Sequence, residues 1–342
     1  MEKYRQWADG GTGINPFVPK WSHHKMSLPL RAVKLLVLFP VALARVVIFA
    51  AAIAWLAVAE LLCALILLPI LRYPVYQGLT YVGCGLALFA LGVVPIGDSL
   101  ADYRRLKVAP PKKGGAKVFD AGRGVLVLAN QQGLTDVLYL GLRLCPTFVF
   151  PAKDGVPVRF SLLGALRRSS TRNANTPAPQ PAKLNDIARW AKSGWRGPVV
   201  VFPEGTRTNG SGILTWNPQT FDGLGSYPPE TALVSLEYSK TGAYTPHHTV
   251  GPASWHVLKL CYQPWHTVKS TWLPSAGTVT SIEGKPLAEQ MASLRTVVSR
   301  MVHECSTVEV AADRHHEFMA YWDASQRKGY TQQQQQPKKK AA

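Results

Sequence analysis

The stretch from Val46 to Ile96 contains only two charged side chains, Glu60 and Arg72. Helices of soluble domains rarely stay uncharged for more than about twenty residues, because their outer face meets water. A hairpin buried in a large soluble core is the alternative, but the stretch is long enough to fill a hydrocarbon layer of roughly 30 Å twice. We therefore expect residues 28–97 to be a membrane anchor. The apolar runs of this anchor are Val46–Leu71 and Tyr73–Ile96.

The two runs permit two arrangements of the anchor. Both could cross the membrane as transmembrane helices, or they could form a re-entrant hairpin that turns around Arg72-Tyr73-Pro74. With either arrangement, Leu28–Arg45 is predicted to add an interfacial helix. Basic residues lie on both sides of the apolar block. Since Lys and Arg are retained on the cytosolic side of a membrane, this distribution favours an even number of crossings with both ends of the chain in the cytosol.

The charge balance of the chain indicates an anionic partner. Lys and Arg number 38 and Asp and Glu number 20, which gives a formal net charge of +18. Behind a membrane anchor, such an excess points to the anionic headgroups of a phospholipid membrane, and we expect no nucleic-acid partner.

The five cysteines show no metal-ligand spacing, and two of them lie inside apolar runs. This usage argues against a zinc site and against a secreted disulfide scaffold. We expect no metal and no bound cofactor, and a water-facing part in the reducing cytosol.

After Asp98 the pattern changes to short apolar strands alternating with amphipathic helices, which is typical of an α/β domain whose sheet is flanked by helices. The predicted strands are 124–129, 147–151, 198–203 and Thr278–Ile282, and the predicted helices are 135–144, 185–192 and 287–304. We assign this domain to residues 98–330.

The two ends of the chain are polar. Residues 1–27 form a polar N-terminal segment with no cleavable signal sequence, and residues 331–342 are predicted to be a disordered basic tail because of their low complexity. Lys339 and Lys340 resemble the dilysine address that retrieves proteins to the endoplasmic reticulum.

Two polar loops follow apolar strands, at the sheet edge where open α/β folds usually carry their sites. The first, Asn130–Asp136, reads NQQGLTD and also suits the start of a helix. The second follows three valines and a phenylalanine and reads PEGTRTNG from Pro203. A carboxylate, a glycine, a hydroxyl and an arginine within four residues favour an anion-binding loop.

The second loop resembles the FPEGTR motif of the glycerophospholipid acyltransferase family, and its distance from Asn130–Asp136 resembles that family's gap to its NHxxxxD motif. Gly284-Lys285-Pro286-Leu287 is similar to the family's closing strand and helix. The opening MEKYRQW…DGGTGINPF resembles the fungal lysophosphatidic acid:oleoyl-CoA acyltransferases of the endoplasmic reticulum and lipid droplets. Together these resemblances cover most of the chain.

The resemblance implies an enzyme that transfers a fatty acyl group from acyl-CoA, as co-substrate, to lysophosphatidic acid or a related lysophospholipid, which makes phosphatidic acid. It also implies an endoplasmic-reticulum membrane location, with the domain on the cytosolic face and lipid droplets as a further site. Carried over by position, the catalytic pair is Gln131 and Asp136, with Asp136 as the orienting residue. The substrate-binding residues are Asn130, Glu204, Gly205, Thr206 and Arg207.

The chain departs from the family at the base position, where Gln131 replaces the motif histidine. An amide forms hydrogen bonds but cannot take a proton near neutral pH. Either transfer depends on positioning and on a base elsewhere, or the chain is a catalytically silent relative that binds lipid or acts as a membrane scaffold. The histidines that could replace the base are His247, His248, His256 and His266. The family's second motif is matched only by candidates, Arg167, Arg168 and Arg172.

Overall fold

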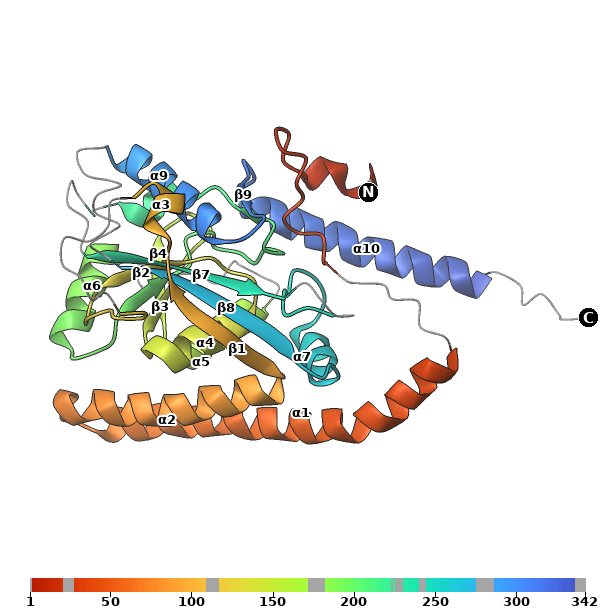
Figure 1. Cartoon of the computed structure of the whole chain (residues 1–342), viewed down its shortest axis with the longest axis horizontal. Helices are drawn as coiled ribbons and strands as arrows, with labels where there is room; N and C mark the ends of the chain where they lie inside the picture. The colour runs from red at the N-terminus through yellow and green to blue at the C-terminus, as the bar shows by residue number, and fades with distance from the viewer. Residues whose placement is uncertain are drawn as a thin grey trace, which may run out of the picture.

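The computed structural model describes residues 2–20, 28–108, 117–171, 182–222, 224, 230–239, 244–274 and 286–335. Its centre is a seven-stranded mixed sheet in the order β1-β8-β7-β2-β5-β3-β4, with helices on both faces (Figure 1). The strands are β1 (Val93–Leu100), β2 (Leu126–Ala129), β3 (Thr147–Pro151), β4 (Pro157–Phe160), β5 (Val199–Val201), β7 (Thr231–Tyr238) and β8 (His266–Leu273), and β6 (Gly212–Ile213) pairs separately with β9 (Ser306–Thr307). The helices are α1 (Leu28–Leu65), α2 (Pro69–Ala90), α3 (Tyr103–Leu106), α4 (Leu134–Leu144), α5 (Leu162–Ser170), α6 (Leu184–Ser193), α7 (Ala253–Cys261), α9 (Leu287–Met301) and α10 (Asp313–Gln335), with short 3₁₀ turns at Glu2–Trp7 and Pro218–Phe221.

The central strands are buried on both faces, which explains their unbroken apolar sequences. β2 pairs in parallel with β5 on one side and with β7 on the other. Successive side chains alternate between two cores. Val127 packs into the core that contains α1, α2, α4 and α5, whereas Leu128 packs into the core of α3, α6 and α9.

The prediction of an α/β domain with a sheet flanked by helices is confirmed. The strand predicted at 147–151 coincides with β3, and β2 and β5 lie inside their predicted ranges. The predicted helices correspond to α4, α6 and α9, with ends that differ by at most three residues. The predicted strand Thr278–Ile282 lies outside the described residues.

The second apolar run is not one helix. α2 ends at Ala90, and Val93–Leu100 instead forms the edge strand β1, which pairs in parallel with β8. Asp98 fixes this strand: its carboxylate accepts hydrogen bonds from Tyr139 and Ser270 and pairs with Arg143 at 2.5 Å. The α/β domain therefore begins before the expected boundary at residue 98, because an uncharged run cannot be assigned to helix or buried strand by composition.

Helices α1 and α2 form a hairpin that lies along the outer face of α4 and α5 (Figure 1). The predicted interfacial helix Leu28–Arg45 is the first part of the continuous α1. The two helices approach closely at Gly83, where a Cβ would lie 2.5 Å from Cδ2 of Leu56.

Two side chains of α1, Arg45 and Glu60, attach this helix to the domain. Arg45 donates to the carbonyl oxygens of Gln263 at 2.5 Å and Pro264 at 2.9 Å, and Glu60 accepts from the backbone N–H of Leu163 at 3.0 Å. These anchoring side chains lie about 22 Å apart along the helix at about 1.5 Å per residue. Both ends of this segment are therefore attached to the α/β domain.

Within the described part of the chain, one stretch, Leu36–Leu65, is long and apolar enough to span a membrane.

α10 extends from the domain beside the N-terminal segment (Figure 1). It continues to Gln335, so its helix runs into the tail that was predicted to be disordered from residue 331, and 336–342 lie outside the described residues. Trp7, Phe17 and Phe318 form a separate apolar cluster that joins the N-terminal segment to α10.

Candidate active site

The two polar loops meet at the carboxyl ends of the adjacent strands β2 and β5. The backbone N–H of Gln131 donates to Oε1 of Glu204 at 3.1 Å, and the carbonyl of Gln131 accepts from the backbone N–H of Thr208 at 3.0 Å. The juxtaposition that the sequence predicted is therefore present, and backbone hydrogen bonds hold it.

The side chain of Asn130, which was predicted to bind substrate, forms hydrogen bonds to the backbone of β7. Its amide Nδ2 donates to the carbonyl of Leu236 at 3.0 Å, and its Oδ1 accepts from the Leu236 N–H at 2.8 Å. The side chain thus extends the pairing between β2 and β7 by one residue, and it is buried.

Asp136, predicted to orient a base at residue 131, caps α4 instead. Oδ2 accepts from the N–H groups of Gln132 at 2.5 Å and Gly133 at 2.7 Å, and Oδ1 accepts from the hydroxyl of Tyr238 at 2.6 Å. The side-chain amide of Gln131 donates elsewhere, to Oγ of Ser169 at 3.4 Å. Burial raises the pKa of Asp136 to about 6, and the three donors oppose this rise.

Glu204 joins the two loops from a fully buried position. Its second oxygen accepts from the backbone N–H of Leu214 at 3.0 Å, so both carboxyl oxygens receive backbone donors. Burial raises the pKa of Glu204 to about 8. Both of these hydrogen bonds of Glu204 are internal to the protein, and its role in substrate binding stays a prediction.

Gly205 is required by the shape of the second loop. Its φ of +68° lies in the left-handed region, and a Cβ there would lie 2.8 Å from Cγ of Pro151. The glycine thereby turns the chain so that Thr206 and Arg207 follow directly at the strand end.

Arg207 lies at the centre of a cluster of buried histidines. Its NH1 donates to the carbonyl of Ser169 at 2.6 Å and to Nδ1 of His248 at 2.8 Å, since a guanidinium can only donate. Nε2 of His248 then carries the hydrogen that is donated to the carbonyl of Gly251 at 3.1 Å. His248 also stacks on His256 with ring centroids 4.3 Å apart.

His315 of α10 completes the cluster and was not nominated from the sequence. Its Nε2 donates to the carbonyl of Thr249 at 2.7 Å, so its Nδ1 accepts from the hydroxyl of Thr206 at 2.5 Å. A pair of adjacent histidines in a polar C-terminal helix gives no local signal of a contact more than a hundred residues away.

Three histidines of the cluster, His248, His256 and His315, have pKa values that favour the neutral imidazole. Burial lowers the pKa of His256 and His315 to about 3 and, together with Arg207, lowers that of His248 well below its ordinary value. Nδ1 of His248 and of His315 is already occupied as an acceptor. The structure thus brings His247, His248 and His256 to the predicted loops but leaves His248 and His256 as weak bases.

His266 begins β8 and does not contact the two loops through any hydrogen bond among the described residues. Burial lowers the pKa of His266 to about 4, and the charge of Arg45 on the docked hairpin lowers it further.

A small hollow opens beside Gln131 and Arg207. Its volume is about 20 Å³, which is room for about one water molecule. Oε1 of Gln131 is buried and has no hydrogen-bond partner among the described residues. The hollow is lined by Gln131, Arg168, Thr171, Gly205, Thr206, Arg207, Ala312, His315, His316 and Met319.

Of the second-motif candidates, Arg168 lines this hollow, and its pKa is lowered by burial. Arg167 is exposed, and Arg172 lies outside the described residues. Two cations, Arg168 and Arg207, therefore face a space that is suited to an anion.

Among the described residues, no group of three or more His, Cys, Asp or Glu side chains is arranged to hold a metal ion. The cysteines are free thiols, and four of the five are buried.

No family model matches the chain, and no curated protein matches it either. Among solved structures, the chain is similar to the crystal structure of the 1-acyl-sn-glycerophosphate (LPA) acyltransferase, PlsC, from Thermotoga maritima. The sequence identity is 15%, the match covers 80% of this chain and 97% of that chain, and the TM-score is 0.42. A likeness at this level does not assign an activity.

Proposed function

We propose that this protein is an acyltransferase that moves a fatty acyl group from acyl-CoA to the free hydroxyl of lysophosphatidic acid or a related lysophospholipid. The observation that carries the proposal is the meeting of the NQQGLTD and PEGTR loops at neighbouring strand ends, around a cationic hollow. Open α/β sheets bind their ligands at this edge.

The hollow offers the acceptor a phosphate site and a hydroxyl site. Arg168 and Arg207 supply positive charge, and an arginine binds a phosphate through a planar fork of donors. Oε1 of Gln131 lacks a partner and can accept a hydrogen bond from the acceptor hydroxyl. This bond orients the hydroxyl oxygen without removing its proton.

The transfer is balanced without a redox step. The hydroxyl oxygen bonds to the thioester carbonyl carbon, the carbon–sulfur bond breaks, and the hydroxyl proton ends on the departing CoA sulfur. Gln131 would hold the acceptor hydroxyl in position, and holding two reactants in the right geometry greatly accelerates a bimolecular reaction. General-base catalysis, which is typically worth about 10²–10⁴-fold, is missing at this residue.

Substrate entry requires movement of α10. A glycerol phosphate is far larger than about 20 Å³, and His315, His316 and Met319 of α10 form the outer wall of the hollow. The N-terminal segment stabilises this wall through the Trp7, Phe17 and Phe318 cluster.

A second candidate function is a catalytically silent relative that binds lysophospholipid. The observation that favours it is that Gln131 cannot take a proton and that Nδ1 of both His248 and His315 already accepts a hydrogen bond. This candidate retains the phosphate site and loses only the chemical step.

The membrane location follows from the same proposal. A hairpin that lies flat on the domain can occupy one leaflet, and a lipid droplet is bounded by a single phospholipid layer. We therefore propose the cytosolic face of the endoplasmic reticulum and the droplet surface as its locations.

The test is an acyl-transfer assay with purified full-length protein, labelled oleoyl-CoA and a panel of lysophospholipids. We expect slow transfer to lysophosphatidic acid, and an increase of about tenfold or more in Gln131→His, because an imidazole there supplies a base. Transfer by neither protein to any acceptor, with saturable lysophosphatidic acid binding retained, would establish the silent relative.

A further inference from the structure

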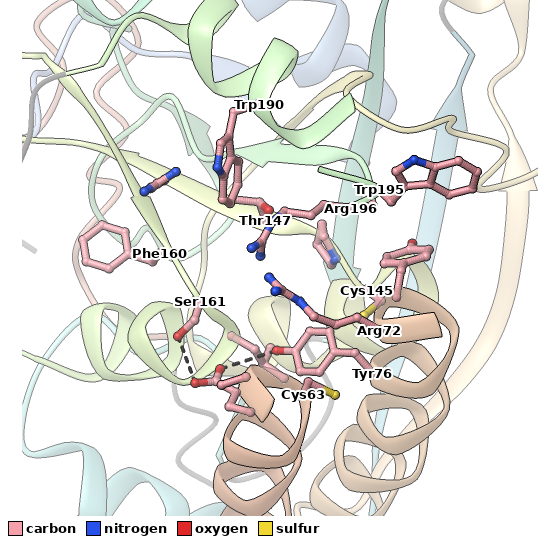
Figure 2. A pocket seen from close by; sticks show the side chains of 17 residues that line it. Cys63, Arg72, Tyr76, Cys145, Thr147, Phe160, Ser161, Trp190, Trp195 and Arg196 are labelled. Carbon is pink, nitrogen blue, oxygen red and sulfur yellow. Dashed lines mark hydrogen bonds between the residues drawn. The ribbon is translucent and has the colours of Figure 1, made fainter. Parts of the chain in front are cut away.

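A cavity of about 350 Å³ lies at the other end of the sheet from the candidate active site. It is bounded by Thr147 at the amino end of β3 and by Gly197 just before β5, whereas the predicted site follows the carboxyl ends of β2 and β5. The turn region of the α1–α2 hairpin forms another part of the wall, together with residues of β4, α5 and α6 (Figure 2). Cavities of roughly 300–1,000 Å³ commonly hold small ligands.

Three arginines from separate parts of the chain line this cavity. Arg72 comes from α2, Arg159 from β4, and Arg196 from the segment before β5. In Figure 2 the side chains of Arg72 and Arg196 both reach into the space. Among the described residues, none of the three arginines pairs with a carboxylate.

The one carboxylate in the cavity is already engaged. Glu60 accepts from the backbone N–H of Leu163 at 3.0 Å, the hydroxyl of Ser161 at 3.2 Å and the hydroxyl of Tyr76 at 3.5 Å. The cavity therefore has three positive groups against one negative group that serves as a cap for α5.

Trp190 holds two of the arginines in place. The guanidinium carbons of Arg159 and Arg196 lie 4.2 and 4.1 Å from its ring centroid. Stacking occupies a face of each guanidinium and leaves the in-plane N–H groups for an acceptor. Burial lowers the pKa of Arg196, and Arg72 and Arg159 lower it further by repulsion, which a bound anion would relieve.

The cationic cavity is lined by Ala64 and Arg72, which flank an exposed apolar turn of the hairpin. Leu65, Leu67, Leu68 and Ile70 at the turn are 71%, 90%, 63% and 60% exposed. An exposed apolar cluster of this kind marks a surface that contacts lipid or a partner. Charge and apolar surface together match a ligand that carries both a phosphate and acyl chains.

We propose that this cavity binds the phosphate of an anionic phospholipid headgroup from the membrane on which the hairpin lies, with the acyl chains against the leucines of the hairpin turn. The site is separate from the candidate active site and does not depend on acyl transfer. A soluble phosphate compound would use the arginines but would leave the apolar turn uncovered.

The test measures binding of dioctanoyl phosphatidylinositol to full-length protein in a non-ionic detergent by isothermal titration calorimetry. This diacyl phosphodiester is neither the acceptor nor the product of the proposed reaction. We expect saturable binding, weakened about tenfold or more in the Arg72→Gln/Arg196→Gln double variant, because two charge-assisted contacts are lost.

The matched control is Arg189→Gln/Arg314→Gln, which removes the same charge from exposed arginines that pair with Asp186 and Glu317. Its affinity should stay within about twofold of wild type, since exposed ion pairs contribute little. Arg72→Gln alone is the second variant if the double variant fails to fold, because Arg72 takes no part in the Trp190 stack.

Unchanged affinity in the cavity variants would overturn the proposal. So would equally tight binding of dioctanoyl phosphatidylcholine, whose headgroup has no net charge, or of glycerol 3-phosphate, which has no acyl chains.

Discussion

Replacing Asp136 by alanine should unfold the start of α4, because the structure gives this carboxylate a capping role. The substitution leaves the N–H groups of Gln132 and Gly133 and the hydroxyl of Tyr238 buried without their acceptor. Each buried group left unpaired costs about 1–3 kcal/mol. The substitution also removes a buried charge, which partly offsets this loss of stability. Burial raises the pKa of Asp136 to about 6, so the carboxylate itself is unfavourable in the native state.

The net loss for Asp136→Ala should be about 3 kcal/mol. A chain of this size loses roughly 2–4 °C of melting temperature per kcal/mol, so the melting temperature should fall by about 6–12 °C. Asp136→Asn should cost only about 1 kcal/mol: its Oδ1 can accept from the two N–H groups, and its Nδ2 can donate to Oη of Tyr238.

The assay is thermal unfolding in detergent, followed by tryptophan fluorescence, alongside acyl transfer by the same samples. Tyr238→Phe serves as the matched control, since it removes one donor and keeps the cap of α4. A structural role predicts that activity per folded molecule changes little in Asp136→Asn. The reasoning would be refuted if Asp136→Ala kept its melting temperature within about 2 °C and lost acyl transfer about 100-fold, which would identify a catalytic residue.

Three further outcomes test the site. Arg207→Lys keeps the charge but loses the bidentate fork, so the apparent KM for lysophosphatidic acid should rise about tenfold, with kcat less affected. A marked fall in the melting temperature of this variant would instead make Arg207 a structural residue, through its hydrogen bonds to Ser169 and His248. The pKa of Glu204 is raised from 4.5 to about 8, so the native state holds a proton that the unfolded chain releases, and stability should fall as pH rises between these values. The melting temperature should therefore change less between pH 5 and pH 8 in Glu204→Gln than in wild type. An equal change in both proteins would contradict the assignment. Phe318→Ala removes a fully buried ring from the cluster that holds α10. Amide hydrogen exchange at the start of α10 should therefore become faster, while the β2 amides stay protected. Unchanged exchange at α10 would mean that other contacts hold this wall of the hollow.

Local patterns in the sequence predicted the elements that depend on local physics. β3 and α4 were identified by apolar periodicity, and the loops after β2 and β5 were placed at one sheet edge because parallel strands end together. The pairing of Gln131 with Glu204 follows directly from that edge.

The role of each loop residue was decided only by tertiary contacts. From the sequence, Asp136 could orient a neighbouring side chain or cap a helix. In the structure it is a cap, because its carboxylate accepts from two backbone N–H groups and from the hydroxyl of Tyr238, which is distant in the sequence. His315 reached Thr206 because α10 folds back over the site, which no local pattern records.

The same limit applies to the anchor. An uncharged sequence determines that Val46–Ile96 avoids water, but bilayer and protein core satisfy that requirement equally. The tertiary structure divided the stretch between a docked hairpin and the edge strand β1, because Glu60 and Asp98 form hydrogen bonds and an ion pair with other parts of the domain.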